Sequence, residues 1–224
     1  AGSRGLSLFL VPKFIPNDDG SLGLRNDFVV TSIEHKLGLK SSPTCSVSYG
    51  ENDGAIGYLI GKENNGLSAM FILMNHARIQ VGMQGASIVE RAYQMAVSYA
   101  EERRQGVIKS QGKAPITIIN HPDVRRMLGL MKAGKDAMKA LGYVAMAGLD
   151  LAGHAESSDV KQFNSARVAL LTPIMKGWCT EFAQELTQLA VQVYGGMGYV
   201  EETGVTQFMR DAKVITIYEG TTGI

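Results

Sequence analysis

A long helical pattern that begins after residues 64–66, Asn-Asn-Gly, is the feature that most constrains the fold of this chain. From 67 to about 105, apolar residues recur at the three- and four-residue intervals of one helical face. A helix of that length is on the order of 55 Å long, so it must pack against other long helices. Gly82, Gly85 and Ala86 leave room for a close neighbour on one side of it.

Two further long helices and a shorter one are predicted downstream. The second spans about 120–155, with a proline in its first turn and an aspartate at its positive end. The third spans 157–194 and begins with Ser-Ser-Asp as a cap, and Pro173 inside it predicts a kink or a restart. The short helix spans roughly 203–212. Helices of these lengths joined by short connections are typical of a bundle.

The first 64 residues instead contain short apolar and β-branched runs separated by turn residues. Residues 15–20, Ile-Pro-Asn-Asp-Asp-Gly, are typical of a turn. A small antiparallel sheet would expose its edges, so we infer that part of the sheet is missing from this chain. The pattern predicts an α+β chain, with a β domain over 1–64 and a helical domain over 65–224. The strands are expected at 6–11, 28–33, 44–49 and 55–60.

Composition excludes several classes of function. A net charge of +1 and a pI near 8.0 provide no basic surface for nucleic acid or an anionic membrane. No apolar run reaches the roughly 18 residues of a membrane helix. The first residues do not have the charged-then-apolar pattern of a secretory signal and resemble the interior of a longer protein. Cys45 and Cys179 form neither a CxxC motif nor a metal-binding pattern, which fits reduced thiols in the cytosol or the mitochondrial matrix.

The end of the chain carries the clearest candidate for catalysis. An apolar run over 214–218 leads to Glu219, and Gly-Thr-Thr-Gly follows it. A carboxylate buried without a partner has a raised pKa and can serve as a general base. Gly220 would let a substrate approach closely. The alternative is that Glu219 caps a surface turn after a buried strand, since most glutamates are exposed.

Two motifs near the C-terminus resemble those of the acyl-CoA dehydrogenase family. One is Met-Arg-Asp-Ala-Lys at 209–213 followed by Ile-Tyr-Glu-Gly-Thr at 217–221, and the other is Gln-Val-Tyr-Gly-Gly-Met-Gly-Tyr at 192–199. Their order and spacing also match, and the similarity extends from about Arg4 to the end. The segments 34–38, 42–45 and 121–128 resemble the branch of longer, fatty-acyl members.

This resemblance implies a fold and a reaction. Residues 1–64 would be the second half of a middle β-barrel domain, and 65–224 an up-down helical bundle. The family uses FAD to convert an acyl-CoA thioester into a trans-2-enoyl-CoA in fatty acid β-oxidation. Glu219 would take the α-proton, while a hydride passes to the flavin. The resemblance also implies an electron-transferring flavoprotein as acceptor, a homodimer or homotetramer, and a location in the bacterial cytoplasm or, second, the mitochondrial matrix.

The resemblance also assigns binding residues. Arg103 and Gln105 fall where the family binds the FAD pyrophosphate across the dimer, although Gln105 replaces a threonine. Each assignment has an alternative that needs no cofactor or substrate. Arg103 would then be a solvated charge at a helix end, and Arg78 would form a salt bridge. The glycines after Tyr194 would form a helix C-cap. The remaining residues assigned to FAD are His121, Gln192, Gly195, Gly196 and Thr221. Those assigned to the substrate are Asn75, Arg78 and Gly220.

Two other functions stay open at this stage. An acyl-CoA oxidase would pass the electrons to oxygen, and a flavin-fold relative could be a non-catalytic scaffold. The intact Glu219 argues against a scaffold. A piece that lacks the N-terminal helical domain and the first half of the β domain is expected to bind FAD weakly or not at all.

Overall fold

The computed structural model describes residues 2–108, 112 and 114–222. The chain divides into two compact units, Ala1–Asn75 and His76–Ile224, which are taken separately below. Helix α1 begins in the first unit and ends in the second. The domain boundary expected between residues 64 and 65 stays a prediction.

The first unit consists of three antiparallel strand pairs, and two of its strands were not predicted. The turn at 17–20 joins them as a hairpin, in which Asn17 N–H donates to the carbonyl of Ser21. The turn predicted from residues 15–20 is therefore confirmed. The two strands that it joins are too short to show a periodic pattern in the sequence. The pairs are β1 (Leu8–Leu10) with β6 (Tyr58–Ile60), β2 (Phe14–Pro16) with β3 (Leu22–Arg25), and β4 (Phe28–Ile33) with β5 (Cys45–Tyr49).

A polar residue, Asn26, is the buried centre of these strands. Its side-chain amide donates to the carbonyls of Pro12 and Ile56 at 2.9 and 2.8 Å, and its Oδ1 accepts from Ile56 N–H at 2.9 Å. Many large apolar side chains of this unit are exposed to solvent, and Leu24, for example, is 81% exposed. Hydrogen bonds therefore hold this unit together more than apolar burial does.

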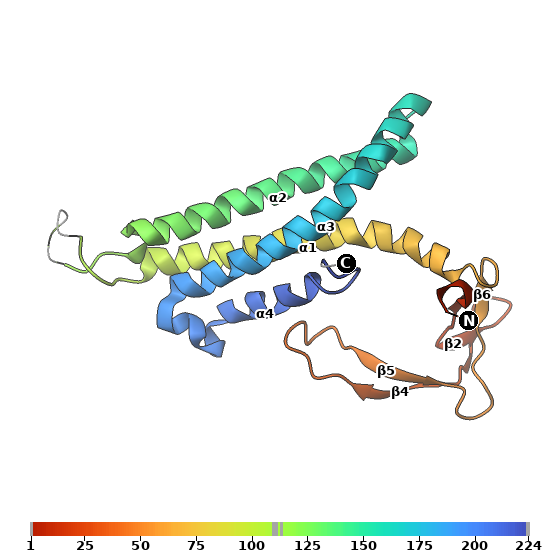
Figure 1. Ribbon diagram of the computed structural model, residues 1–224. Coiled ribbons are helices and arrows are strands. Elements are labelled where there is room, and N and C mark those ends of the chain that lie inside the picture. Colours follow the sequence, from red (N-terminus) through yellow and green to blue (C-terminus); the bar gives the residue numbers. More distant parts are fainter. Residues whose placement is uncertain (1, 109–111, 113, 223–224) are drawn as a thin grey trace. The chain divides into compact units, whose positions relative to one another are not determined.

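The second unit is a helical bundle, as the sequence predicts. Figure 1 shows successive helices running in alternate directions, with α2 beside α3 and α4 on the other side of α3. No helix in the described part of the chain combines the length and apolar character needed to cross a membrane. The helices are α1 (Gly66–Glu102), α2 (Pro122–His154), α3 (Ser158–Tyr194) and α4 (Val205–Ile215), with 3-10 turns at Ile118–Asn120, Gly195–Tyr199 and Glu201–Thr203.

Helix α3 corrects one expectation from the sequence. It passes through Pro173 as one element, so no restart occurs there. The Thr172 hydroxyl donates to the carbonyl of Val168 inside the helix and does not cap a new one. A proline removes one backbone donor, and packing against α2 and α4 supports the continuous helix. At the start of α3, Ser157 occupies the N-cap position, but its side chain makes no capping hydrogen bond.

Helices α1 and α3 approach one another to backbone contact. A Cβ atom added at Gly82 would lie 2.8 Å from the carbonyl oxygen of Met175, and one at Gly85 would lie 2.8 Å from that of Cys179. The close neighbour expected beside these glycines is therefore α3. The largest fully buried side chains of the described residues belong to the helical unit and include Ile79, Met131, Met138, Met175, Leu186 and Ile215.

A cluster of charged side chains joins α1 to α2. Lys135, only 8% exposed, places its ammonium 3.0 Å from Glu90 Oε2 and 2.9 Å from Asp136 Oδ1. Lys139 reaches the same oxygen of Glu90 at 2.5 Å. The hydrogen bond from Lys139, together with that from Lys135, lowers the pKa of Glu90 to about 2. A half-buried carboxylate thus bridges two lysines of the neighbouring helix.

Replacing Glu90 by Gln should destabilise the helical unit by about 1–3 kcal/mol at neutral pH, because two lysines lose their shared carboxylate. The pKa of Glu90 is lower in the folded state than the ordinary 4.5, so its contribution is present above that value and is lost as pH falls through about 2. Urea unfolding at a series of pH values measures this.

Arg126→Gln is the matched control, because the Arg126–Asp123 pair is exposed to solvent. It should change the free energy of unfolding by less than about 1 kcal/mol. The interpretation of Glu90 is wrong if the difference between wild type and Glu90→Gln stays constant from neutral to acidic pH.

Candidate active site

The turn that carries Glu219 follows directly from the end of α4. This helix continues to Ile215, three residues beyond the expected end, and residues 216–219 form the turn. The apolar run 214–218 is therefore helix end and turn, not strand. Glu219 itself has φ 54° and Gly220 has φ 102°. A left-handed conformation costs a residue with a side chain about 1–2 kcal/mol, so its surroundings must hold Glu219 there.

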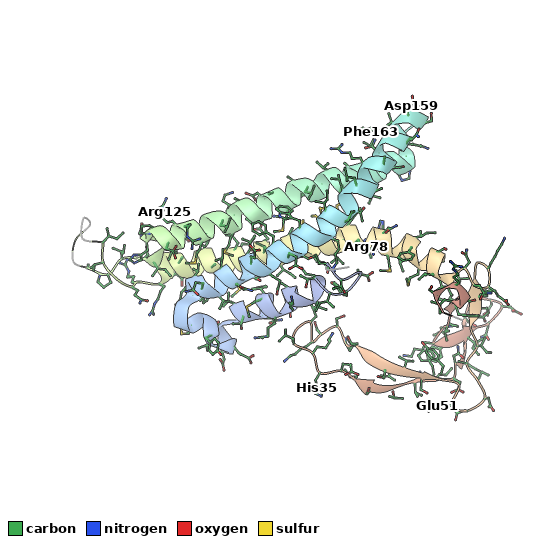
Figure 2. All side chains as sticks on the ribbon, in the orientation of Figure 1. His35, Glu51, Arg78, Arg125, Asp159 and Phe163 are labelled. Carbon is green, nitrogen blue, oxygen red and sulfur yellow. The ribbon has the colours of Figure 1, made fainter. Side chains whose placement is uncertain are left out.

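Hydrogen bonds from α1 and from within the turn hold this backbone. Arg78, labelled on α1 in Figure 2, donates from Nε to the carbonyl oxygen of Glu219 at 3.0 Å. Thr222 N–H donates to the carbonyl of Thr216 at 3.1 Å, and Thr221 Oγ1 donates to that of Ile217 at 3.2 Å. The structure thus gives Arg78 a contact with the candidate base, whereas the sequence assigned it to the substrate.

A cavity of about 490 Å³ borders this turn. Arg78 forms part of its wall together with two residues that the sequence assigned to the substrate and the cofactor, Gly220 and Thr221. Asn75, the third residue assigned to the substrate, is exposed on α1 and belongs to the first unit. The full wall consists of Arg78, Pro173, Lys176, Gly177, Gly220, Thr221 and Thr222.

The residue before Glu219 adds an aromatic ring to its surroundings. The hydroxyl of Tyr218 donates to the side-chain oxygen of Gln84 on α1. Burial raises the pKa of Tyr218, and the negative charge of Glu219 raises it further. Glu219 is half-buried. A half-buried carboxylate on a fixed turn can act as a proton acceptor for a ligand in the adjacent cavity.

A second cavity, of about 300 Å³, brings together four of the residues predicted to bind FAD. Arg103 and Gln105 follow the end of α1, and Gly195 and Gly196 follow the end of α3. Nothing lies within 4 Å of a Cβ added at either glycine, so both backbones are open to a ligand. The remaining wall consists of Tyr99, Ile118, Val193, Tyr194 and Met197.

Two other predicted FAD residues support this cavity without lining it. His121 Nε2 lies 2.7 Å from the carbonyl oxygen of Gln105. The backbone carbonyl of Gln192 accepts a hydrogen bond from the N–H of Gly195 at the end of α3, where Gly195 has φ 58°. This is the helix C-cap that the sequence offered as the alternative. Backbone bonds between 103–106 and 116–118 fix the position of Arg103.

Two features of these cavities were not identified from the sequence. Tyr99 and Tyr194 stack with ring centroids 4.0 Å apart and form one wall of the second cavity. Lys176 borders the first cavity. The sequence could have indicated the burial of Lys176, because this charged residue lies on the same helical stripe as the buried Thr172, Met175 and Cys179.

Comparison with known proteins identifies the family. The family model described as "Acyl-CoA dehydrogenase, C-terminal domain" matches residues 64–224. The chain is 48% identical over its full length to 3-methylmercaptopropionyl-CoA dehydrogenase of Ruegeria pomeroyi, of which it covers 37%. It is 38% identical to a broad-specificity linear acyl-CoA dehydrogenase of Mycobacterium tuberculosis, again over 100% of this chain and 38% of the relative.

A solved structure agrees with this assignment. Caenorhabditis elegans ACDH-11 in complex with C11-CoA superimposes with a TM-score of 0.81 at 30% identity, over 99% of this chain and 34% of that one. The chain belongs to the acyl-CoA dehydrogenase family. It spans little more than a third of the length of the relatives named here.

Replacing Gly220 by Ala should disturb the turn in two ways. The positive φ is unfavourable for alanine by about 1–3 kcal/mol. The new Cβ would also lie 2.9 Å from Nη2 of Arg78, the residue whose Nε binds the carbonyl of Glu219. We expect a lower melting temperature, measured by circular dichroism. Gly153→Ala is the matched control, since Gly153 lies on α2 with open space around it. This variant should be more stable by up to about 1 kcal/mol, because alanine favours a helix more than glycine does. Equal melting of the two variants would contradict the role of Gly220.

Proposed function

We propose that this chain supplies the catalytic base and part of the cofactor site of a flavin-dependent acyl-CoA dehydrogenase. Such an enzyme converts an acyl-CoA into its trans-2-enoyl-CoA. The observation that carries the proposal is the left-handed Glu219, whose carbonyl is bound by Arg78 beside a cavity of about 490 Å³. A strained residue held in place at a cavity is typical of active sites.

In this proposal Glu219 takes the α-proton of the thioester. Removing a weakly acidic C–H proton requires a carboxylate held in a fixed position near the substrate. Arg78 provides that position by binding the backbone of Glu219, so it acts on the base and not on the reacting carbons. Gly220 leaves the neighbouring space free of a side chain.

FAD is the cofactor that the proposal requires, and when bound it would accept the hydride from the β-carbon. The second cavity suits its phosphates and its nucleotide end. Arg103 offers a guanidinium for a pyrophosphate, and Gly195 and Gly196 offer open backbone. Thr221 lies apart from these residues, in the wall of the first cavity beside Glu219. Residues at both cavities can therefore contribute to one extended cofactor site or to the sites of two subunits.

The partners are part of the proposal. A homodimer or homotetramer, with an electron-transferring flavoprotein as acceptor, is proposed on the basis of the family resemblance. ACDH-11 is solved with C11-CoA, and the Ruegeria relative is named for a thioether acyl-CoA. We therefore propose an acyl-CoA substrate, to be tested with butyryl-CoA, a long-chain acyl-CoA and 3-methylmercaptopropionyl-CoA. The bacterial cytoplasm remains the proposed location, ahead of the mitochondrial matrix.

Replacing Glu219 by Gln in the full-length protein should lower turnover by about 10²–10⁴-fold, the usual contribution of a general base. Anaerobic bleaching of the flavin by acyl-CoA reports the reductive half-reaction, and exchange of the α-proton with deuterated water reports proton removal alone. Both should be lost while FAD remains bound. Electron transfer to a flavoprotein or to oxygen, measured in parallel, distinguishes a dehydrogenase from an oxidase.

Glu202→Gln is the matched control, because Glu202 is an exposed acid on the short turn before α4. It should leave both rates unchanged. The proposed function fails if Glu219→Gln retains wild-type turnover and exchange. A scaffold would show neither bleaching nor exchange in the wild-type protein with FAD bound.

Replacing Arg103 by Ala should weaken FAD binding by about tenfold to a hundredfold, because a charge-assisted hydrogen bond to phosphate is lost. Arg104→Ala is the matched neighbour, since Arg104 Nη1 donates to the carbonyl of Pro115 and does not line the cavity. Bound flavin per protein chain, read from visible absorbance after gel filtration, measures both. Equal FAD loss in the two variants would contradict the role given to Arg103.

A further inference from the structure

Lys176 is a buried cation without a partner. It lies on α3 and is 4% exposed. Among the residues that the structure describes, it carries the one buried side-chain nitrogen or oxygen atom that makes no hydrogen bond. Burying an ammonium group without a partner is unfavourable, and buried charges in proteins are normally paired. A group that is missing from the described residues is therefore expected to bind Lys176.

The space beside Lys176 is large enough for such a group. Lys176 lines the cavity of about 490 Å³, together with Arg78 from α1 and Gly220 from the turn. Among the described residues of this wall, two side chains are cations and none is a carboxylate. The wall therefore offers positive charge from two helices, α1 and α3, which suits an anion.

The charged groups around Lys176 do not satisfy it. Glu181 on α3 and Glu219 on the turn attract its ammonium, and Arg78 repels it, but neither carboxylate forms an ion pair with it. Burial has the largest effect and lowers the pKa of Lys176. An anion beside Lys176 would oppose this effect of burial and favour the charged form.

Several acceptors of the turn near Lys176 already have hydrogen-bond donors. The carbonyl of Thr216 already accepts the backbone N–H and the hydroxyl of Thr222. The carbonyl of Ile217 accepts from Thr221, and that of Glu219 accepts from Arg78. Three carbonyls of the turn are therefore already engaged with other donors, and among the described residues none accepts a hydrogen bond from Lys176 Nζ.

We propose that Lys176 and Arg78 form an oxyanion-binding site in this cavity, which takes a phosphate or carboxylate group. Lys176 is its main ligand, because its ammonium is buried and has no other bond. Arg78 contributes a second positive charge while Nε remains on the carbonyl of Glu219. The site goes beyond the proposed dehydrogenation, because it needs neither the flavin nor the carboxylate of Glu219.

The test is an anion titration of the full-length protein at constant ionic strength, with sodium chloride replaced by sodium phosphate or sodium acetate, or with added coenzyme A. A ligand that binds the folded state raises the melting temperature in a saturable way. We expect such a rise for the wild type. Replacing Lys176 by Met should weaken the apparent affinity about tenfold to a hundredfold, as expected for loss of a charge-assisted bond.

The three ligands distinguish the source of the oxyanion. A response to coenzyme A at much lower concentration than to phosphate assigns the site to a phosphate group carried on a ligand. A response to phosphate alone assigns it to the free ion, and a stronger response to acetate assigns it to a carboxylate. If no ligand raises the melting temperature of the wild type, the proposal is overturned.

Control variants separate this site from general effects of charge. Arg167→Met removes an exposed cation from α3 and should keep the full response. Lys176→Gln provides a second test if Lys176→Met does not fold. Glu219→Gln should lower turnover strongly yet keep the anion response, which distinguishes this proposal from the proposed function. An equal response in Lys176→Met and in the wild type would refute the assignment.

Discussion

The backbone contact between α1 and α3 determines where the candidate active site lies. Gly82 and Gly85 bring α1 against the carbonyls of Met175 and Cys179. Arg78 is one helical turn before Gly82, and Lys176 directly follows Met175. The same contact that closes the bundle therefore places two cations in the wall of one cavity. Any larger side chain at Gly82 would separate the helices and the two charges together.

The candidate base depends on this scaffold more than on its own turn. Glu219 occupies a backbone conformation that a glutamate rarely adopts, and Arg78 from α1 binds its carbonyl. A helix thus fixes a residue that follows a different helix, more than a hundred residues further along the chain. Positioning from a rigid element suits a base whose distance to the substrate must be maintained.

The sequence predicted the long helices well, because 3.6-residue periodicity over more than thirty residues is unambiguous. It missed β2 and β3, which are too short for any period to appear. It also ended α4 early, since the β-branched residues around Val214 favour a strand while packing on α3 extends the helix.

In the candidate site, too, the sequence motifs identified some residues, but not the contacts between segments that are far apart in the chain. Motifs placed Arg103 and Gly195 in one site, and the structure brings them to one cavity. The bond from Arg78 to Glu219 and the unpaired state of Lys176 depend on residues far apart in sequence. No local pattern could have predicted either, because both arise from the packing of α1, α3 and the C-terminal turn.

The hydrogen-bonded centre at Asn26 has a thermodynamic consequence for the chain. The heat capacity change of unfolding follows the apolar surface that becomes exposed. The strand unit already exposes residues such as Leu22 and Leu24, whereas the helical unit hides Met131, Met138 and Leu186 completely. Within this chain, the helical unit therefore contributes more of the heat capacity change of unfolding than the strand unit does.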